Sequence, residues 1–120
     1  MDAPQMETFT QEWLRSWNAR DLEAILSHYT EDVEFQSLLA VRILGEASGV
    51  IRGRARLREY IGALLAAFPG SPELELLGVF RGVGSLVVHF QSKGRRAAEV
   101  MEFDDAGKVR RALAHSQLGS

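Results

Sequence analysis

The stretch FTQEWLRSWNARDLEAILSHYTEDVEF, residues 9–35, decides how the rest of the chain is read. Phe9, Trp13 and Trp17 recur every four residues, which is the spacing of one face of an α-helix. Asn18 is a residue type that can close a helix in the left-handed conformation. We therefore expect a first helix that carries a strongly aromatic stripe and ends near Asn18.

Capping signals predict the bounds of two helices. Thr8 with Gln11 resembles a capping box and marks the start of the first helix. Asp21 can cap a second helix, whose apolar residues follow the i, i+3, i+4, i+7 rule: Leu22, Ile25, Leu26 and Tyr29. Two short amphipathic helices joined at residues 18–20 are therefore expected to pack against a common partner.

A β-hairpin is expected next. The pattern changes to period two after the second helix, with Phe35 and Ser37 on one face. The apolar residues 38–44 extend this strand, residues 45–49 offer a glycine-bearing turn, and residues 50–53 can return antiparallel.

A third helix and four further strands complete the predicted order. Helical periodicity returns at Arg54 and continues to Phe68, where Pro69-Gly70-Ser71-Pro72 stops it. The remaining chain is typical of strands separated by three glycine-bearing turns, at residues 73–81, 86–92, 96–103 and 109–116. Helices in the N-terminal half followed by a meander of strands indicate a segregated α+β fold rather than an alternating parallel one.

The composition excludes several classes of function. A chain of 120 residues fits one domain, residues 1–120. The net charge is -2 and the 14 lysines and arginines are spread along the chain, which argues against a nucleic-acid partner. No cysteine is present and the three histidines are scattered, so we expect no metal and no cofactor. With no leader pattern and no membrane-spanning apolar run, we expect a cytoplasmic protein with no membrane partner.

Three segments carry a resemblance to a known family. WNARDLEAILSHYTEDVEF at residues 17–35, IRGRARLREYIGALLAAF at residues 51–68 and EVMEFDDAGKVRR at residues 99–111 resemble the nuclear transport factor 2-like superfamily, and more narrowly its bacterial SnoaL-like members. The resemblance implies a strongly curved antiparallel sheet folded into a cone around the three helices. It also implies a cavity at the open end of the cone and a homodimer.

The catalytic residues of two enzymes of that superfamily can be compared with the residues at the corresponding positions of this sequence. Ketosteroid isomerase needs a carboxylate base on the first strand and a tyrosine with a protonated carboxylic acid as oxyanion hole. The resemblance puts Ser37 and Trp13 at the first two positions, where neither can do the same chemistry, and only Glu99 matches in type. Steroid isomerisation is therefore not expected. The Asp-Arg-Asp set of limonene epoxide hydrolase has no counterpart on the expected pocket face.

The register of two late strands predicts a pair of site residues. A three-residue loop at residues 93–95 would place His89 directly opposite Glu99 on one face, with Val87 opposite Met101 beyond them. A His-Glu pair among apolar residues is suited to general acid or base catalysis, so we predict both as catalytic residues. The alternative is a cross-strand pair that only satisfies two polar groups at a cavity rim.

Large aromatic side chains are candidates for the wall of an apolar pocket. The predicted pocket residues are Trp13, Trp17, Tyr29, Phe35, Ser37, Tyr60 and Met101. The alternative for the aromatic residues is ordinary core at helical or strand spacing, which we favour for Trp17 and Phe35. For Trp13 and Tyr29 the resemblance favours the pocket wall.

Two functions from different classes remain open. The first is a protein that binds an apolar, ring-like small molecule. Such a protein could only bind this molecule, or it could also catalyse an isomerase- or cyclase-type proton transfer on it. The second is a non-catalytic dimeric module whose outer sheet face binds another copy or another protein. It is suggested by an apolar row that would otherwise face water, Leu86, Val88, Phe90 and Val100.

Overall fold

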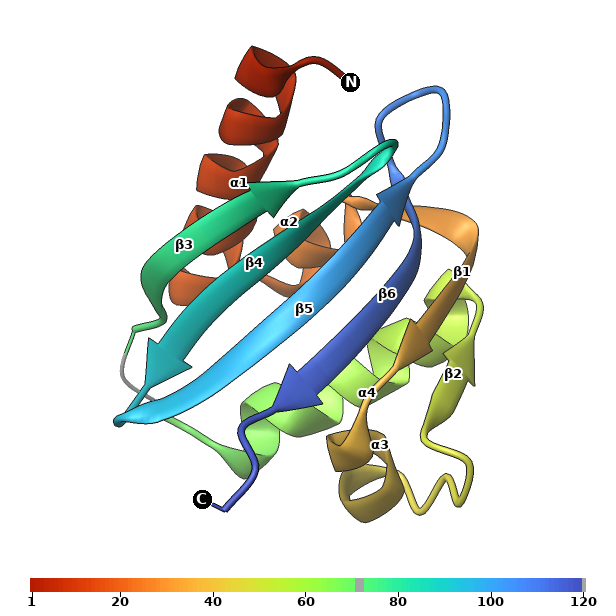
Figure 1. Cartoon of the computed structure of the whole chain (residues 1–120). Coiled ribbons are helices and arrows are strands. Elements are labelled where there is room, and N and C mark those ends of the chain that lie inside the picture. Colours follow the sequence, from red (N-terminus) through yellow and green to blue (C-terminus); the bar gives the residue numbers. More distant parts are fainter. Residues whose placement is uncertain (71–72, 120) are drawn as a thin grey trace.

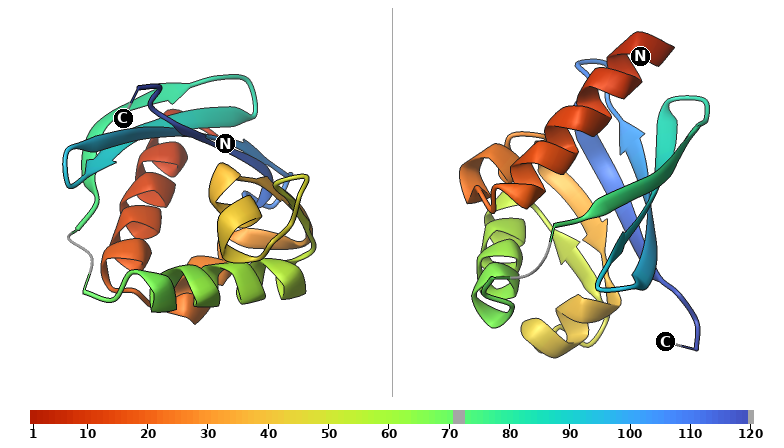
Figure 2. Two further views of the ribbon diagram at one scale, coloured as in Figure 1. Left: turned by 90° about the horizontal axis from the view of Figure 1, so that it is seen from below. Right: turned by 90° about the vertical axis from the view of Figure 1, so that its left-hand side faces the viewer.

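The computed structural model describes residues 1–70 and 73–119 and shows helices on one side of a curved six-stranded sheet (Figures 1 and 2). The helices are α1 (Ala3–Asn18), α2 (Leu22–Leu26), α3 (Leu38–Ile43) and α4 (Arg54–Ala67). The strands are β1 (Tyr29–Gln36), β2 (Val50–Arg52), β3 (Glu75–Arg81), β4 (Ser85–Ser92), β5 (Arg95–Phe103) and β6 (Val109–Ser116). The predicted α+β class, with a curved sheet wrapped around helices of the N-terminal half, is confirmed.

The first helix begins earlier than predicted. Asp2 is the N-cap of α1 and forms a reciprocal capping box with Gln5, so the helix start expected at Thr8 is wrong. Asp2 is followed by a proline in the first turn, where the missing N-H costs nothing, and this gives the stronger start signal. The predicted cap of α2 is confirmed, since the Asp21 side chain accepts from the Ala24 N-H.

The joint between α1 and α2 also differs from the prediction. The residue with positive φ is Arg20, at 54°, and not Asn18. Asn18 uses its side-chain amide to bind the backbone of Leu74, accepting from its N-H at 2.7 Å and donating to its carbonyl at 3.3 Å. The end of α1 is thereby tied to the start of the strand meander.

Residues 38–44 do not extend the first strand, and this prediction is wrong. The Ser37 side chain accepts from the Leu39 N-H and caps α3, which diverts the chain into a helix. Leu38 is 72% exposed, so the apolar run is not a buried strand. The antiparallel return is confirmed, because Phe35 of β1 pairs with Ile51 of β2. The connection is a helix and loop instead of a tight turn.

The third predicted helix and the late strands agree closely with the structure. α4 buries Leu57, Tyr60 and Ile61, as its periodicity predicts. Strands β3 to β6 begin and end within two residues of the predicted ranges. Of the predicted helix stop, Ser71 and Pro72 lie outside the described residues.

The sheet has the order β2-β1-β6-β5-β4-β3, and all neighbouring strands are antiparallel except β1 and β6. We call the side that carries the helices the inner face and the opposite side the outer face. In the view from below, α1, α4 and α3 surround the inner face (Figure 2). No helix in the described ranges is long and apolar enough to cross a membrane.

Candidate functional site

The register between β4 and β5 separates the two predicted catalytic residues. Lys93 and Gly94 both have positive φ, 55° and 74°, so the hairpin has a two-residue loop and not the expected three-residue one. This moves the pairing by one residue, and His89 pairs with Ala98 while Glu99 pairs with Val88. The predicted His89-Glu99 pair is therefore wrong, and the two side chains point to opposite faces.

The same shift corrects the faces of their neighbours. Met101 pairs with Leu86 instead of Val87, and both are fully buried in the core. Val88 is also fully buried and Phe90 packs against the core. The expected outer row that contained Leu86, Val88 and Phe90 is wrong, because these side chains lie on the inner face.

Glu99 lies on the inner face, among apolar side chains. It is only 5% exposed, with Val88 and Ala114 opposite it on the two neighbouring strands. Its Oε2 atom has no hydrogen-bond partner among the residues that the structure describes. Burial raises the pKa of Glu99 from 4.5 to about 7. Glu99 is therefore a carboxyl group that changes protonation near neutral pH.

The charge of Glu99 affects the pKa values of two buried tyrosines, Tyr29 and Tyr60. Burial raises the pKa of Tyr29 well above its usual value, and the charge of Glu99 raises it further. Burial also raises the pKa of Tyr60, against the opposing effect of the hydrogen bond with Ser37 and with a further rise from Glu99. The Tyr60 hydroxyl lies 3.1 Å from Ser37 Oγ. Both phenols thus stay protonated at neutral pH and can act as donors.

The indole N-H groups of Trp13 and Trp17 lie near the hydroxyl group of Tyr29. They are close enough to the Tyr29 oxygen to lower the pKa of Tyr29, yet neither reaches hydrogen-bonding geometry. We call Trp13, Trp17, Tyr29 and Glu99 the buried polar cluster. Each has a buried polar atom without a hydrogen-bond partner in the described part of the chain. Native proteins leave few such atoms unpaired, so we take the buried polar cluster as the candidate functional site.

Apolar residues surround the buried polar cluster. The Phe35 ring lies 6.1 Å from that of Tyr29 and 5.8 Å from that of Tyr60. The Phe90 ring contacts Trp13, with centroids 5.5 Å apart, so Phe90 lies on the inner face and not on the predicted outer face. Recognition of the Lys93-Gly94 turn would have put Phe90 on the inner face. Further partly buried apolar residues from four elements pack against the same core: Leu39, Ile43, Leu64, Leu76 and Ala114.

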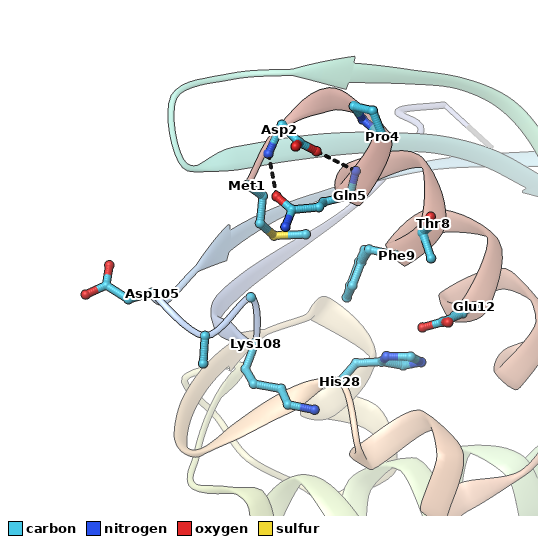
Figure 3. A pocket seen from close by; sticks show the side chains of 12 residues that line it. Met1, Asp2, Pro4, Gln5, Thr8, Phe9, Glu12, His28, Asp105 and Lys108 are labelled. Carbon is cyan, nitrogen blue, oxygen red and sulfur yellow. Dashed lines mark hydrogen bonds between the residues drawn. The ribbon is translucent and has the colours of Figure 1, made fainter.

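A separate open groove of about 530 Å³ lies between the start of α1 and the turn from β5 to β6 (Figure 3). Phe9, Glu12, His28 and Lys108 are among its lining residues, and none of the buried polar cluster is. Two of its lining residues have polar contacts within the chain: Lys108 donates to the Ser27 carbonyl at 2.8 Å, and His28 Nε2 lies 3.4 Å from Ser16 Oγ. Burial lowers the pKa of His28. Within residues 1–70 and 73–119, no three His, Asp or Glu side chains could together hold a metal ion.

Comparison with known proteins gives the family. A family profile described as a SnoaL-like domain matches residues 10–112. A SnoaL-like protein of unknown function from Burkholderia thailandensis is 38% identical, with 97% of each chain covered and a TM-score of 0.90. A search of curated proteins found no match.

More distant solved structures share the fold. A protein of unknown function with a cystatin-like fold from Methylobium petroleophilum is 18% identical, covering 100% of this chain and 80% of that one, with a TM-score of 0.74. The epoxide hydrolase/cyclase-like enzyme SalBIII, of pyran ring formation in the polyether salinomycin, is 21% identical, covering 98% and 94%, with a TM-score of 0.74. The curved sheet, the helices on its inner face and these matches agree: the chain belongs to the SnoaL-like family.

Proposed function

We propose that this protein binds an apolar, ring-like metabolite against the buried polar cluster and transfers a proton on it, with Glu99 as the acid or base. The observation that carries the proposal is the unpaired Glu99 carboxyl, buried among apolar residues with a pKa of about 7. A group with this pKa exists in both protonation states at neutral pH, as general acid-base catalysis requires. His89 has no part in the proposed reaction, since it lies on the outer face.

The apolar surroundings of Glu99 support a proton transfer. Buried and with no hydrogen-bond partner for its Oε2 atom in the described part of the chain, an ionised Glu99 is poorly stabilised and takes up a proton readily. Tyr29 remains protonated and can donate to negative charge that develops on the ligand. The aromatic rings of Phe35, Phe90 and Trp13 offer apolar contacts for a ring.

One relative suggests the type of reaction. SalBIII is described as an epoxide hydrolase/cyclase-like enzyme of pyran ring formation, and ring formation of this kind moves protons between oxygen atoms. At 21% identity the likeness concerns the fold, so the reaction class rests on Glu99. We accordingly favour an isomerase- or cyclase-type proton transfer.

The test compares two glutamates on one strand. A panel of cyclic ketones and hydroxy-epoxides is screened for turnover, and any activity is then measured in Glu99→Gln and Glu102→Gln. Loss of an acid-base group costs on the order of 100-fold or more in rate, so Glu99→Gln is expected to abolish turnover. Glu102 is on the outer face, paired with arginines, and its variant should keep the rate. Unchanged turnover in Glu99→Gln would remove its assigned role.

A second candidate function is a homodimer formed through the outer face. The strand register aligns an apolar row there, Phe80, Val87, Val100 and Leu113, and Phe80 is 63% exposed. Burying such a row against a second copy removes apolar surface from water. We expect sedimentation to detect a dimer that Val100→Arg dissociates, and a monomer at high protein concentration would contradict this function. A dimer leaves room for a ligand site in each subunit.

A further inference from the structure

The open groove between the start of α1 and the turn from β5 to β6 is large enough to hold a small molecule of its own (Figure 3). Its volume of about 530 Å³ lies within the range of small-molecule sites, roughly 300–1,000 Å³. Its lining side chains include three carboxylates and one ammonium group, those of Asp2, Glu12, Asp105 and Lys108. The groove side chains therefore carry an excess of negative charge.

The hydrogen bonds of Ser16 determine which nitrogen of His28 can accept. Ser16 Oγ donates its only hydrogen to the Trp13 carbonyl at 2.8 Å, so His28 Nε2, 3.4 Å from Ser16 Oγ, is the donor of that contact. Burial lowers the pKa of His28, against a rise caused by the charge of Glu12 and with a further lowering from Lys108. In the neutral ring the lone pair is then on Nδ1, which is an acceptor and not a donor.

Glu12 and Lys108 differ in whether their charged groups already have a partner. Lys108 Nζ donates to the Ser27 carbonyl at 2.8 Å and is held against the chain. The Glu12 carboxylate forms no hydrogen bond or ion pair within the described residues. Figure 3 shows it beside the His28 ring at one end of the groove, with the Phe9 ring next to them. This end of the groove thus offers acceptors beside an aromatic ring.

We propose that the groove binds a small organic ammonium ion that carries an aromatic ring. The ammonium group would donate to the Glu12 carboxylate and to His28 Nδ1, and its charge would balance the excess of carboxylates. The ring would pack against Phe9, which is positioned by edge contacts with His28 and Phe103, at centroid distances of 5.4 and 4.9 Å. This site is independent of the function proposed for Glu99, since no residue of the buried polar cluster lines the groove.

Three probes with the same indole ring and the same two-carbon arm test the choice of charge on the full chain: tryptamine with an ammonium group, tryptophol with a hydroxyl and indole-3-propionate with a carboxylate. Binding is measured at pH 7.5 by titration followed in two-dimensional ¹H-¹⁵N NMR spectra, which report both affinity and location. We expect tryptamine to bind at least about threefold more tightly than tryptophol, and indole-3-propionate to bind most weakly. The shifted amide signals should centre on Phe9, Glu12 and His28.

Two variants of lining residues should have opposite effects. Glu12→Gln removes the carboxylate that has no partner and should weaken tryptamine binding by about threefold, with tryptophol affinity unchanged. Lys108→Gln removes the cationic side chain and should strengthen tryptamine binding. Glu7→Gln is the matched control for charge, because Glu7 is exposed on the same helix and does not line the groove. It should leave the affinities of all three probes unchanged.

Four outcomes would overturn the inference. They are equal affinities for tryptamine and tryptophol, no binding of tryptamine, equal losses in Glu12→Gln and Glu7→Gln, and shifts confined to residues around Glu99. The last outcome would place the indole ring in the buried polar cluster instead of the groove. The comparison of probes on the unaltered protein decides the matter even where a variant does not fold.

Discussion

Glu99 and Glu102 lie three residues apart on β5 and face opposite sides of the sheet, in contrasting surroundings. On the outer face, Glu102 belongs to a row of alternating charges across four strands, which we call the outer ladder: Arg52, Glu34, Arg111, Glu102 and Arg110. The ion pairs of the outer ladder have N-O distances of 2.6 to 3.3 Å. On the inner face, Glu99 has apolar neighbours and an oxygen with no partner in the described chain.

The pKa shifts of the carboxyl groups on the two faces have opposite directions. Glu34 of the outer ladder has a lowered pKa, first through the Gln36 amide and then through Arg111, so its charged form is stabilised. Glu99 has a raised pKa because burial disfavours its charge. A carboxylate that only stabilised the sheet would be expected to have a lowered pKa and charged partners, as Glu34 does. The setting of Glu99 costs stability at neutral pH, which is typical of groups kept for a ligand or a reaction.

The largest expected effect is on the pH dependence of stability. The folded protein keeps the Glu99 proton up to about pH 7, whereas the unfolded chain releases it near pH 4.5. The folded state therefore has an advantage at low pH that is lost as the pH rises from 4.5 to 7, by about 3 kcal/mol in total. Glu99→Gln removes this dependence. Urea unfolding of both proteins at pH 5 and pH 8 should show the difference between their free energies of unfolding changing by about 2.5 kcal/mol, since part of the loss falls below pH 5.

Glu34→Gln serves as the control of opposite sign. Because the pKa of Glu34 is lowered in the folded protein, its contribution is present above pH 4.5 and lost as the pH falls. Its removal should therefore cost stability at pH 8 and not at low pH. If the effects of Glu99→Gln and Glu34→Gln on the free energy of unfolding change with pH in the same direction, the two carboxyl groups do not have opposite pKa shifts.

A smaller effect is expected within the outer ladder. Arg111 bridges Glu34 and Glu102, with N-O distances of 3.1 and 3.3 Å, and its side chain is 41% exposed. Exposed ion pairs contribute little and are screened by salt. Arg111→Gln should lower Tm by at most about 3 °C, and the loss should shrink in 1 M NaCl. A large loss that does not depend on salt would mean that this ladder acts through packing and not through charge.

The smallest effect concerns the turn that decides which face Glu99 occupies. Lys93 has a φ of 55°, in the left-handed region that Asn adopts more easily. Asn-Gly is the preferred pair for a two-residue hairpin loop of this kind. Lys93→Asn should therefore stabilise the protein by about 0.5 kcal/mol in urea unfolding. A destabilised variant would indicate a different loop and would reopen the register that places Glu99 inside.

Local patterns in the sequence predicted much of the fold, and one backbone angle accounts for the main error in the site. Strong periodicity placed α4 and the four late strands, because each signal lies within one segment. Lysine is not a usual residue at positive φ, so the loop at Lys93 was predicted one residue too long and His89 was paired with Glu99. Likewise, the single hydroxyl of Ser37 converts an apparent strand into α3.

The buried polar cluster had no local signal as a unit. Its members come from α1, β1 and β5, and their meeting depends on the packing of the whole domain. The sequence predicted Trp13, Trp17, Tyr29 and Glu99 individually as site residues, which remains a prediction. The unpaired state of their polar atoms became visible only in three dimensions.

The parallel pairing of β6 with β1 bears on how the chain folds during synthesis. β6 lies between the pair β2-β1 and the meander β3-β4-β5, so these two parts of the sheet share no strand contact until β6 is in place. Both parts are already synthesised when Val109, the first residue of β6, leaves the ribosome. Closing the sheet then requires contacts between residues about 80 apart in the chain, such as Tyr29 with Val109, and such distant contacts form slowly. Until β6 pairs, one edge of β1 and one edge of β5 are open, and open strand edges favour aggregation.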